Sequence, residues 1–354
     1  MANLNEMRGA MFSADAWRSF LFVFAGAAVL MVYGYGMKRY DERRKQWVVG
    51  GLLIALCLAD MWTVNKRYLS DDMFVAKSER DVHFSPSQTD LEIRKDQSLD
   101  YRVLNLATST FNENNTSYWH KSVGGYHAAK LRRYQELIEA HIQPEMNRLY
   151  DAVIEAQGDM TQVSDSVSPV INMLNTKYLI LPVDQQGNTV PLRNGNALGN
   201  AWFVQGVDYV DNANEELERT GRQHPQQVAV VDKQFKEALH DAPAVLPVDP
   251  AARVQLVEYR PNHLRYETES STDGVVVFSE IYYPDWTATV DGQPAPIGRA
   301  DYVLRAMQVP AGKHVIEMTF DPQSIRTTEA VAWAAMLVLL GGIVAALVRL
   351  GRKK

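Results

Sequence analysis

Two long apolar runs that carry no charge constrain this chain more than any other feature. Residues 19–37 (SFLFVFAGAAVLMVYGYGM) and 330–348 (AVAWAAMLVLLGGIVAALV) each contain 19 uncharged residues. A helix needs about 20 mostly apolar residues to cross the ~30 Å hydrocarbon core of a bilayer. We therefore expect a membrane span near each end of the chain.

A third apolar run is shorter. Residues 46–59 are uncharged over 14 positions, a length that buried core helices also reach, and the run then continues through Asp60 to residue 64. Trp47 and Trp62 bracket it, as interfacial aromatic residues bracket membrane spans. We interpret residues 46–64 as a second span, so that residues 1–64 form two transmembrane helices (about 19–37 and 46–64) with a basic loop between them.

The basic residues predict the orientation. The loop at residues 38–45 contains five lysines and arginines, and the tail at residues 349–354 contains four and no acid. Because cytoplasmic flanks are enriched in such residues, both are expected to be cytoplasmic. Residues 65–327 and the N-terminus are then expected to lie outside the cytoplasm.

The first 18 residues have neither the basic start nor the cleavage site of a signal peptide. A chain that begins outside with nothing to export it is expected to be the tail of a longer polytopic protein, preceded by a further N-terminal membrane region. A complete three-span protein with an exported N-terminal tail is the alternative.

The composition limits the partners. Cys57 is the only cysteine, which excludes a disulfide scaffold, and an apolar fraction of 46% excludes a disordered chain. The net charge of −6 argues against a nucleic-acid partner, because no domain-wide basic surface is available to displace counterions from phosphates.

The polar middle of the chain consists of two regions with different sequence patterns. Residues 65–249 predict a mixed α/β domain, because short apolar strands alternate with helical periodicity. The expected strands are residues 102–107, 177–182, 201–210 and 227–231, and the expected helices start near residues 128, 145, 169 and 213. Pro144 should kink or end the first of these helices, and Asn212 or Asn214 should cap the last.

Residues 250–327 contain short strands every 8 to 12 residues, which is the spacing of a β-sandwich. Asp291-Gly292 is a hairpin dipeptide between two of these strands. The predicted fold is therefore membrane α-helical spans plus an extracytoplasmic α+β domain with a C-terminal β-sandwich, followed at residues 328–354 by a transmembrane helix and a basic cytoplasmic tail.

Several stretches resemble the YfhO family of bacterial multi-pass membrane proteins. They are residues 60–69 (DMWTVNKRYL), 109–114 (STFNEN), 120–127 (HKSVGGYH), 130–134 (KLRRY), 174–178 (LNTKY), 199–203 (GNAWF) and 277–284 (VFSEIYYP). The resemblance covers nearly the whole chain but only the C-terminal portion of the family, whose members carry many more N-terminal spans.

This resemblance implies a protein of the bacterial cytoplasmic (inner) membrane similar to membrane glycosyltransferases. Such enzymes take sugar from a lipid-phosphate donor, here a polyprenyl-phosphate-linked sugar, and modify a cell-envelope glycopolymer. Their essential carboxylate lies in an early extracytoplasmic loop that this chain does not contain, so no catalytic residue can be transferred to it.

The densest cluster of binding chemistry lies between the first strand and the first helix of the α/β domain. The cluster consists of Trp119, His120, Lys121, Tyr126, His127, Lys130, Arg132 and Arg133. Aromatic faces stack on sugar rings, cations bind phosphates, and Gly124-Gly125 would let backbone amides approach a ligand. A structural loop whose histidines and tyrosine pack on the sheet explains the same residues equally well.

Other chemistries find less support. His120 and His127 are seven residues apart with no carboxylate nearby, and no Cys/His spacing resembles a zinc site. The sequence also contains neither a Gly-rich phosphate loop nor a Gly-x-Ser-x-Gly elbow. We therefore expect no metal and no cofactor. Asp60 is the one acid within an apolar span, which makes it a functional candidate, although a hydrated position near the outer interface is favoured.

Two hypotheses for function follow. In the first, the chain is the C-terminal part of a glycosyltransferase-like protein whose exported domain binds substrate or donor headgroup through residues 119–127. In the second, it is a non-catalytic, membrane-anchored envelope module that binds proteins or polysaccharides.

Overall fold

The computed structural model describes residues 2–36, 41–79, 84–184 and 186–352 of the chain. Lys38 and Arg39 of the basic loop, and Lys353 and Lys354 of the basic tail, lie outside the described residues. The chain forms two compact units, residues 1–85 and 86–354, and each is described below by itself.

The first unit is built from two long helices, α1 (Ala2–Met31) and α2 (Glu42–Tyr68). A π-helical turn, η1 (Val32–Gly36), follows α1, and a single 3₁₀ turn, η2 (Asp71–Met73), follows α2. The segments Arg8–Tyr35 and Glu42–Tyr68 are both long and apolar enough to cross a membrane. The shorter apolar run is therefore part of a helix of spanning length, as expected, and not a buried core helix.

The second unit ends in the third helix of this kind, α10 (Gln323–Arg352), whose segment Gln323–Arg349 is long and apolar enough to span. Its large apolar side chains are exposed, for example Trp333 at 64% and Val338 at 75%. Water would make such exposure unfavourable, whereas a lipid environment does not, so this helix suits a bilayer.

The α/β part of the second unit contains two small sheets. In the first, β1 (Arg102–Asn105) runs parallel to β2 (Thr176–Pro182), and β3 (Thr189–Arg193) runs antiparallel to β2. In the second, β5 (Gly206–Val210) runs parallel to β6 (Val228–Asp232), with α9 (Ala213–Thr220) as the connection. The other helices are α4 (Gln88–Ile93), α5 (Asn115–Trp119), α6 (Arg132–Leu137), α7 (Gln143–Glu155) and α8 (Pro169–Met173).

The helical segment around Pro144 was expected to kink or end at the proline. The helix begins at Arg132, four residues later than predicted, and it does not end at Pro144 but continues as α7. A π-helical turn, Ile138–Ile142, lies just before Pro144. Proline lacks an N–H and clashes with the carbonyl four residues earlier, and the wider π turn absorbs this mismatch, so α6 and α7 remain one continuous helical run.

The strand expected at residues 201–210 is two strands in different sheets. The chain bends at Gln205, and Gly206 packs so closely that an added Cβ would lie 2.4 Å from the Ala244 carbonyl oxygen. The first half, β4 (Ala201–Val204), pairs with β9 (Gly274–Ile281), whereas the second half is β5. Asn212 caps α9, accepting hydrogen bonds from the amides of Asn214 and Glu215.

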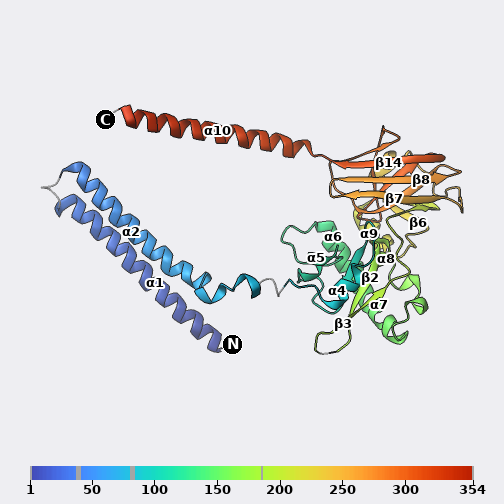
Figure 1. Cartoon of the computed structure of the whole chain (residues 1–354), viewed down its shortest axis with the longest axis horizontal. Helices are drawn as coiled ribbons and strands as arrows, with labels where there is room; N and C mark the ends of the chain where they lie inside the picture. The colour runs from blue at the N-terminus through green and yellow to red at the C-terminus, as the bar shows by residue number, and fades with distance from the viewer. Residues whose placement is uncertain (1, 37–40, 80–83, 185, 353–354) are drawn as a thin grey trace. The chain divides into compact units, whose positions relative to one another are not determined.

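The C-terminal part is a β-sandwich, as predicted (Figure 1). One sheet has the order β11-β10-β14-β8-β7 and the other has the order β12-β13-β9-β4. The remaining strands are β7 (Arg253–Arg260), β8 (His263–Ser270), β10 (Trp286–Val290), β11 (Gln293–Ala295), β12 (Gly298–Ala300), β13 (Leu304–Val309) and β14 (Gly312–Phe320). Because β4 belongs to the second sheet, the sandwich includes residues from before position 250.

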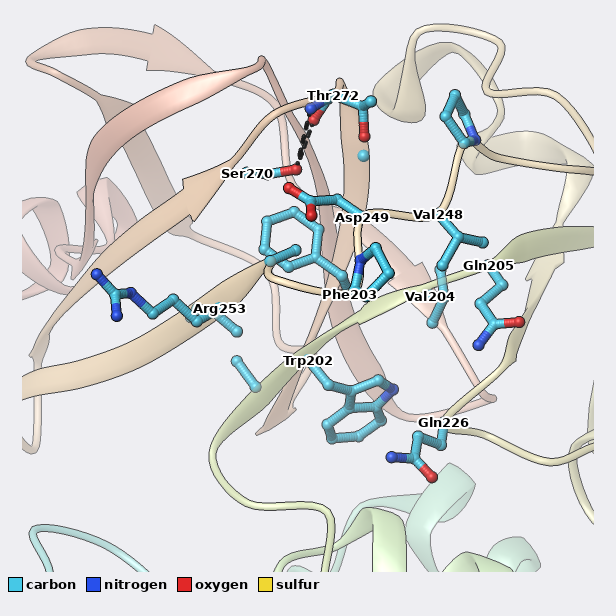
Figure 2. Close-up of a pocket in the computed structure, with 16 residues that line it drawn as sticks. Trp202, Phe203, Val204, Gln205, Gln226, Val248, Asp249, Arg253, Ser270 and Thr272 are labelled. Carbon is cyan, nitrogen blue, oxygen red and sulfur yellow. Dashed lines mark hydrogen bonds between the residues drawn. The ribbon is translucent and has the colours of Figure 1, made fainter.

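The two sheets share one apolar core. Tyr266 and Ile316 of the first sheet and Phe278 and Met307 of the second are fully buried within it. Burying a large side chain of this kind contributes about 1.5–3 kcal/mol, so the facing sheets are a main source of stability. A pocket lies at one edge of the sandwich, where the outer strands β4 and β7 meet (Figure 2).

Candidate functional site

Three residues of the predicted cluster line one pocket. This pocket, called the Trp119 pocket below, has a volume of about 290 Å³. Its lining consists of Arg94, Leu99, Asp100, Tyr101, Trp119, His120 and Lys121. These residues come from the end of α4, the segment before β1 and the end of α5, which meet because α5 packs beside β1.

His120 fixes one wall of the Trp119 pocket. Its Nε2 lies 2.9 Å from Oδ1 of Asp90, a residue that also closes the N-terminal capping box of α4 with Ser87. Burial alone would raise the pKa of Asp90, but the bonds from His120 and Ser87 lower it overall. His120 is buried, and its bond to Asp90 connects the end of α5 to α4.

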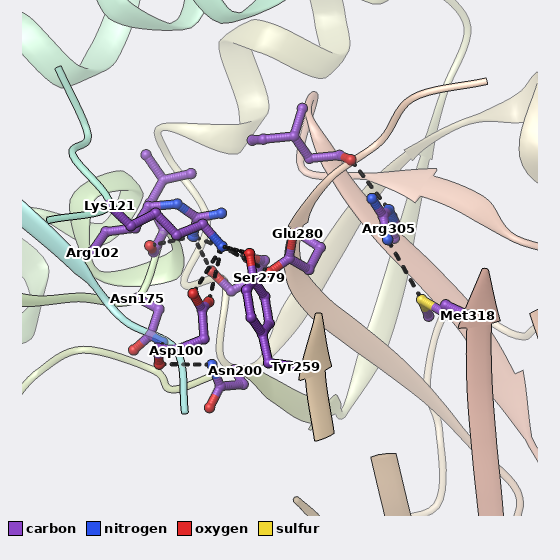
Figure 3. A network of polar contacts seen from close by, with 12 residues as sticks. Asp100, Arg102, Lys121, Asn175, Asn200, Tyr259, Ser279, Glu280, Arg305 and Met318 are labelled. Atoms are coloured by element: carbon purple, nitrogen blue, oxygen red, sulfur yellow. Dashed lines mark hydrogen bonds and ion pairs between the residues drawn. The ribbon is translucent and has the colours of Figure 1, made fainter. Parts of the chain in front are cut away.

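Lys121 lies at the centre of a polar network (Figure 3). Its Nζ donates to both carboxylate oxygens of Asp100 at 3.0 Å, to the Tyr259 hydroxyl at 3.0 Å and to Glu280 Oε1 at 3.1 Å. Burial alone would lower the pKa of Lys121, but Glu280 and Asp100 outweigh it and raise the pKa. Lys121 is therefore a permanently charged group.

Asp100 is held from several directions. Asn175 and Asn200 donate to its backbone carbonyl at 3.1 and 3.0 Å, which fixes the position of its carboxylate beside Lys121. Burial raises the pKa of the Asp100 carboxyl, against the opposing effect of Lys121. A rigidly positioned carboxylate and ammonium thus form the inner end of the Trp119 pocket.

Arg102 of β1 lies two residues after Asp100 and connects this strand to neighbouring segments. It is buried, and its Nη1 donates to the carbonyl of Leu174 at 2.7 Å and to the carbonyl and hydroxyl of Ser279 at 2.9 and 3.0 Å. Because Ser279 belongs to β9, these bonds attach the three-stranded sheet to the sandwich (Figure 3). Arg102 therefore connects the start of β1, beside the pocket, to the sandwich.

Arg94 and two aromatic rings form the outer part of the Trp119 pocket. The Arg94 guanidinium lies over the Trp119 ring, 4.9 Å from its centroid, and in the described part of the chain it makes no ion pair. Tyr101 donates its hydroxyl to the Ile93 carbonyl at 3.1 Å, which holds its ring at the pocket. A cation stacked on an indole and free of a carboxylate is available to an anionic ligand.

The other cluster residues lie elsewhere. Tyr126 and His127 are exposed, and Lys130 lies over the Phe111 ring at 5.6 Å. Arg132 pairs with Glu136 at 2.9 Å on the surface of α6, and Arg133 reaches buried Glu216 at 3.3 Å. None of these five lines the Trp119 pocket.

The Gly124-Gly125 pair serves packing. A Cβ at Gly124 would lie 2.1 Å from the Thr110 carbonyl oxygen, and the Gly125 amide donates to that same oxygen at 2.7 Å. Gly125 also has φ of +99°, which favours glycine. The glycines thus let two loops touch, and their amides are not free for a ligand.

Asp60 is in the first unit, within α2. Its Oδ1 lies 3.5 Å from Nε of Arg18, and Arg67 pairs with Asp15 at 2.6 Å, so two cations and two carboxylates connect α1 to α2. Asp60 lies 18 residues after Glu42, about 27 Å along the helix, which is close to the ~30 Å thickness of a hydrocarbon core. This position supports the interfacial interpretation, at the opposite end of the hairpin from the basic loop.

Sequence reasoning missed Arg94, Asp100, Tyr101 and Glu280. Glu280 lies within the quoted stretch VFSEIYYP, and Asp100 comes two residues before the first predicted strand. Both residues could have been noticed in the sequence, because each is a charged residue at or near a strand end, where functional residues are often found. Arg94 gave no signal, since its role depends on where α5 packs.

Comparison with protein families found one match. The model of the family described as "Bacterial membrane protein YfhO" matches residues 246–332. The match runs from before β7 into α10, about a quarter of the chain, and confirms the resemblance to the C-terminal portion of that family over these residues. Comparison with curated proteins and with solved structures found no match.

Proposed function

We propose that this chain acts as part of a polytopic bacterial inner-membrane protein that modifies a cell-envelope glycopolymer. In this proposal, residues 86–322 lie outside the cytoplasm and bind the sugar-phosphate headgroup of a lipid-linked sugar in the Trp119 pocket. Three helices of spanning length and the family match support the membrane setting. The family resemblance supports the glycosyltransferase-like chemistry.

The arrangement of Arg94 over Trp119 carries the proposal. Arg94 offers a guanidinium that no described carboxylate neutralises, and guanidinium groups bind phosphates in bidentate geometry. Trp119 and Tyr101 offer apolar surface for the sugar ring, while the Asp100 carboxylate, held in place by Lys121, offers an acceptor for hydroxyls. A phosphate and a sugar thus each find matching groups in one pocket.

The pocket supports binding more than catalysis. Asp100 and Glu280 are both engaged by Lys121, so neither is a free base in this arrangement. Because neither carboxylate is a free base, a non-catalytic envelope module is the second candidate function. In that case the pocket would recognise the headgroup or a related glycan without transferring it.

The test uses the full chain in nanodiscs and isothermal titration with hexose 1-phosphates (of glucose, galactose, mannose and N-acetylglucosamine). We expect saturable binding of at least one of them, and Arg94→Ala should weaken it about 10- to 100-fold, because a lost charged hydrogen bond is worth about 1.5–3 kcal/mol.

Arg132→Ala is the matched control, since Arg132 is an exposed arginine whose partner is Glu136 and which lies off the pocket. It should leave the affinity unchanged. If no hexose 1-phosphate binds, or if both variants bind as well as the wild type, the proposed site is wrong.

A further inference from the structure

A second cavity lies at the open edge of the sandwich. β4 and β7 are the terminal strands of the two sheets, and the segment before β7 passes beside them. Between them is a cavity of about 390 Å³, called the edge hollow below (Figure 2). Its volume lies within the range of about 300–1,000 Å³ typical of small-molecule sites.

Two aromatic residues of β4 line the edge hollow, and Trp202 is the buried one, with its Nε1 donating to the Pro225 carbonyl at 2.8 Å. Phe203 of β4 is half-buried, and Figure 2 shows its ring beside Asp249. The ring lies against the backbone of Gly274, where an added Cβ would be 2.8 Å from the Phe203 Cδ1 atom. Gly274 therefore lets the ring lie flat against the strand and holds it in place as an apolar platform.

The charged groups of the edge hollow already have partners. The Asp249 carboxylate accepts hydrogen bonds from the amides of Ser271 and Ala251 and from the Ser271 hydroxyl, and these bonds lower its pKa, so it stays anionic. Arg253 is paired with Glu269. Among the lining residues that the structure describes, no free cation is therefore available to an anionic ligand, and the Asp249 charge disfavours one.

The free polar groups are uncharged. Gln205 and Gln226 both line the hollow, both are exposed, and in the described part of the chain neither side-chain amide makes a hydrogen bond to protein. Each amide offers both a donor and an acceptor, which is what vicinal sugar hydroxyls require.

A neighbouring cavity shares lining residues with the edge hollow. Asp249, Arg253 and Ser270 line a neighbouring cavity of about 520 Å³ as well, so a ligand longer than one ring can extend from one cavity to the next. From the Phe203 ring, the two amides, the lack of a free cation among the described lining residues and this extension, we propose that the edge hollow is a binding site for a neutral oligosaccharide. It is distinct from the Trp119 pocket and does not depend on the function proposed for that pocket.

The test uses the full chain in phosphatidylcholine nanodiscs, because alkyl maltoside detergents themselves carry sugars. The probes are malto-, cello- and chito-oligosaccharides, with oligogalacturonate as an anionic comparison, and binding is measured by isothermal titration. We expect saturable binding of at least one neutral series and weaker binding of oligogalacturonate.

Two variants locate the site. Gln205→Ala and Gln226→Ala should each weaken the affinity about two- to tenfold, the effect of one lost neutral hydrogen bond. Gln227→Ala is the matched control, because Gln227 is an exposed neighbour that does not line the hollow. Arg94→Ala should also leave this affinity unchanged.

Three results would overturn the proposal. They are the absence of binding by all three neutral series, an equal loss in Gln226→Ala and Gln227→Ala, and a loss in Arg94→Ala without a loss in Gln226→Ala. The third would assign the sugar to the Trp119 pocket instead.

Discussion

Lys121 and Glu280 are 159 residues apart in sequence, yet Nζ of the lysine lies 3.1 Å from Oε1 of the glutamate. Lys121 follows α5 in the α/β part, and Glu280 belongs to β9 of the sandwich. The same ammonium also binds Asp100 and Tyr259, so a single side chain connects the pocket floor to both sheets of the sandwich. The pocket and the junction between the two parts are therefore one structural unit.

This junction predicts a stability effect. Lys121→Met should lower the free energy of unfolding by about 1.5–3 kcal/mol, because Asp100 and Glu280 lose their shared partner while largely buried. Lys313→Met is the control, since its pair with Glu269 is exposed and such pairs contribute about 0–1 kcal/mol. Thermal unfolding followed by tryptophan fluorescence measures both, and equal melting temperatures for the two variants would contradict the interpretation.

Asp301 predicts a pH dependence. It is fully buried, one of its carboxylate oxygens has no hydrogen-bond partner among the residues that the structure describes, and burial raises its pKa from 3.8 to about 8. The folded state therefore holds a proton that the unfolded state releases, so this contribution is complete below about pH 4 and is lost as the pH rises to about 8. The free energy of unfolding should fall across that interval.

Asp301→Asn mimics the protonated form and can still accept from the Val230 amide. Asn also tolerates the positive φ of 48° at this position. The variant should be more stable than the wild type at pH 8.5 and should show a flatter pH profile. Part of the remaining slope should come from Glu145, whose pKa burial raises to about 7, and from Glu216, whose pKa burial also raises. If the two profiles are parallel in denaturant titrations at several pH values, Asp301 does not titrate in this range.

The Gly124 contact predicts a steric effect. Gly124→Ala places a methyl group against the Thr110 carbonyl and should cost about 1–3 kcal/mol of stability, as overpacking does. Gly195→Ala is the control, because nothing lies within 4 Å of an added Cβ there. Comparison of the two melting temperatures checks this, and a neutral Gly124→Ala would mean that the loop adjusts freely.

The orientation proposed from the basic loop can be tested by labelling. In a variant with Cys57 replaced by serine, a cysteine at Asn188, which is exposed between β2 and β3, should react with a membrane-impermeant thiol reagent added to intact cells. A cysteine at Asp41 should react only after the membrane is opened. The reverse pattern would place residues 86–322 in the cytoplasm.

Local features of the sequence were sufficient to predict much of the fold. The apolar runs predicted three spans, and Asp291-Gly292 forms its turn with φ of 50° and 78°. Strand 286–290 is present with the predicted bounds. Each of these depends on residues close together in the chain, where periodicity and turn chemistry act directly.

Features that depend on distant segments could not be predicted in this way. β4 joins the sandwich only because β9, more than 70 residues later, offers it a free edge. The Trp119 pocket depends likewise on Arg94 meeting Trp119 and on Lys121 meeting Glu280. The cluster was predicted from neighbouring positions, so it combined the three residues that line the pocket with five that point to other surfaces.

The central claim, that a sugar-phosphate headgroup binds in the Trp119 pocket, is tested most directly by amide hydrogen exchange. The full chain in nanodiscs is compared with and without a saturating hexose 1-phosphate, and exchange is followed peptide by peptide. We expect slower exchange in residues 94–101 and 119–121 and little change in residues 126–133. Protection confined to residues 126–133, or to segments away from the pocket, would contradict it.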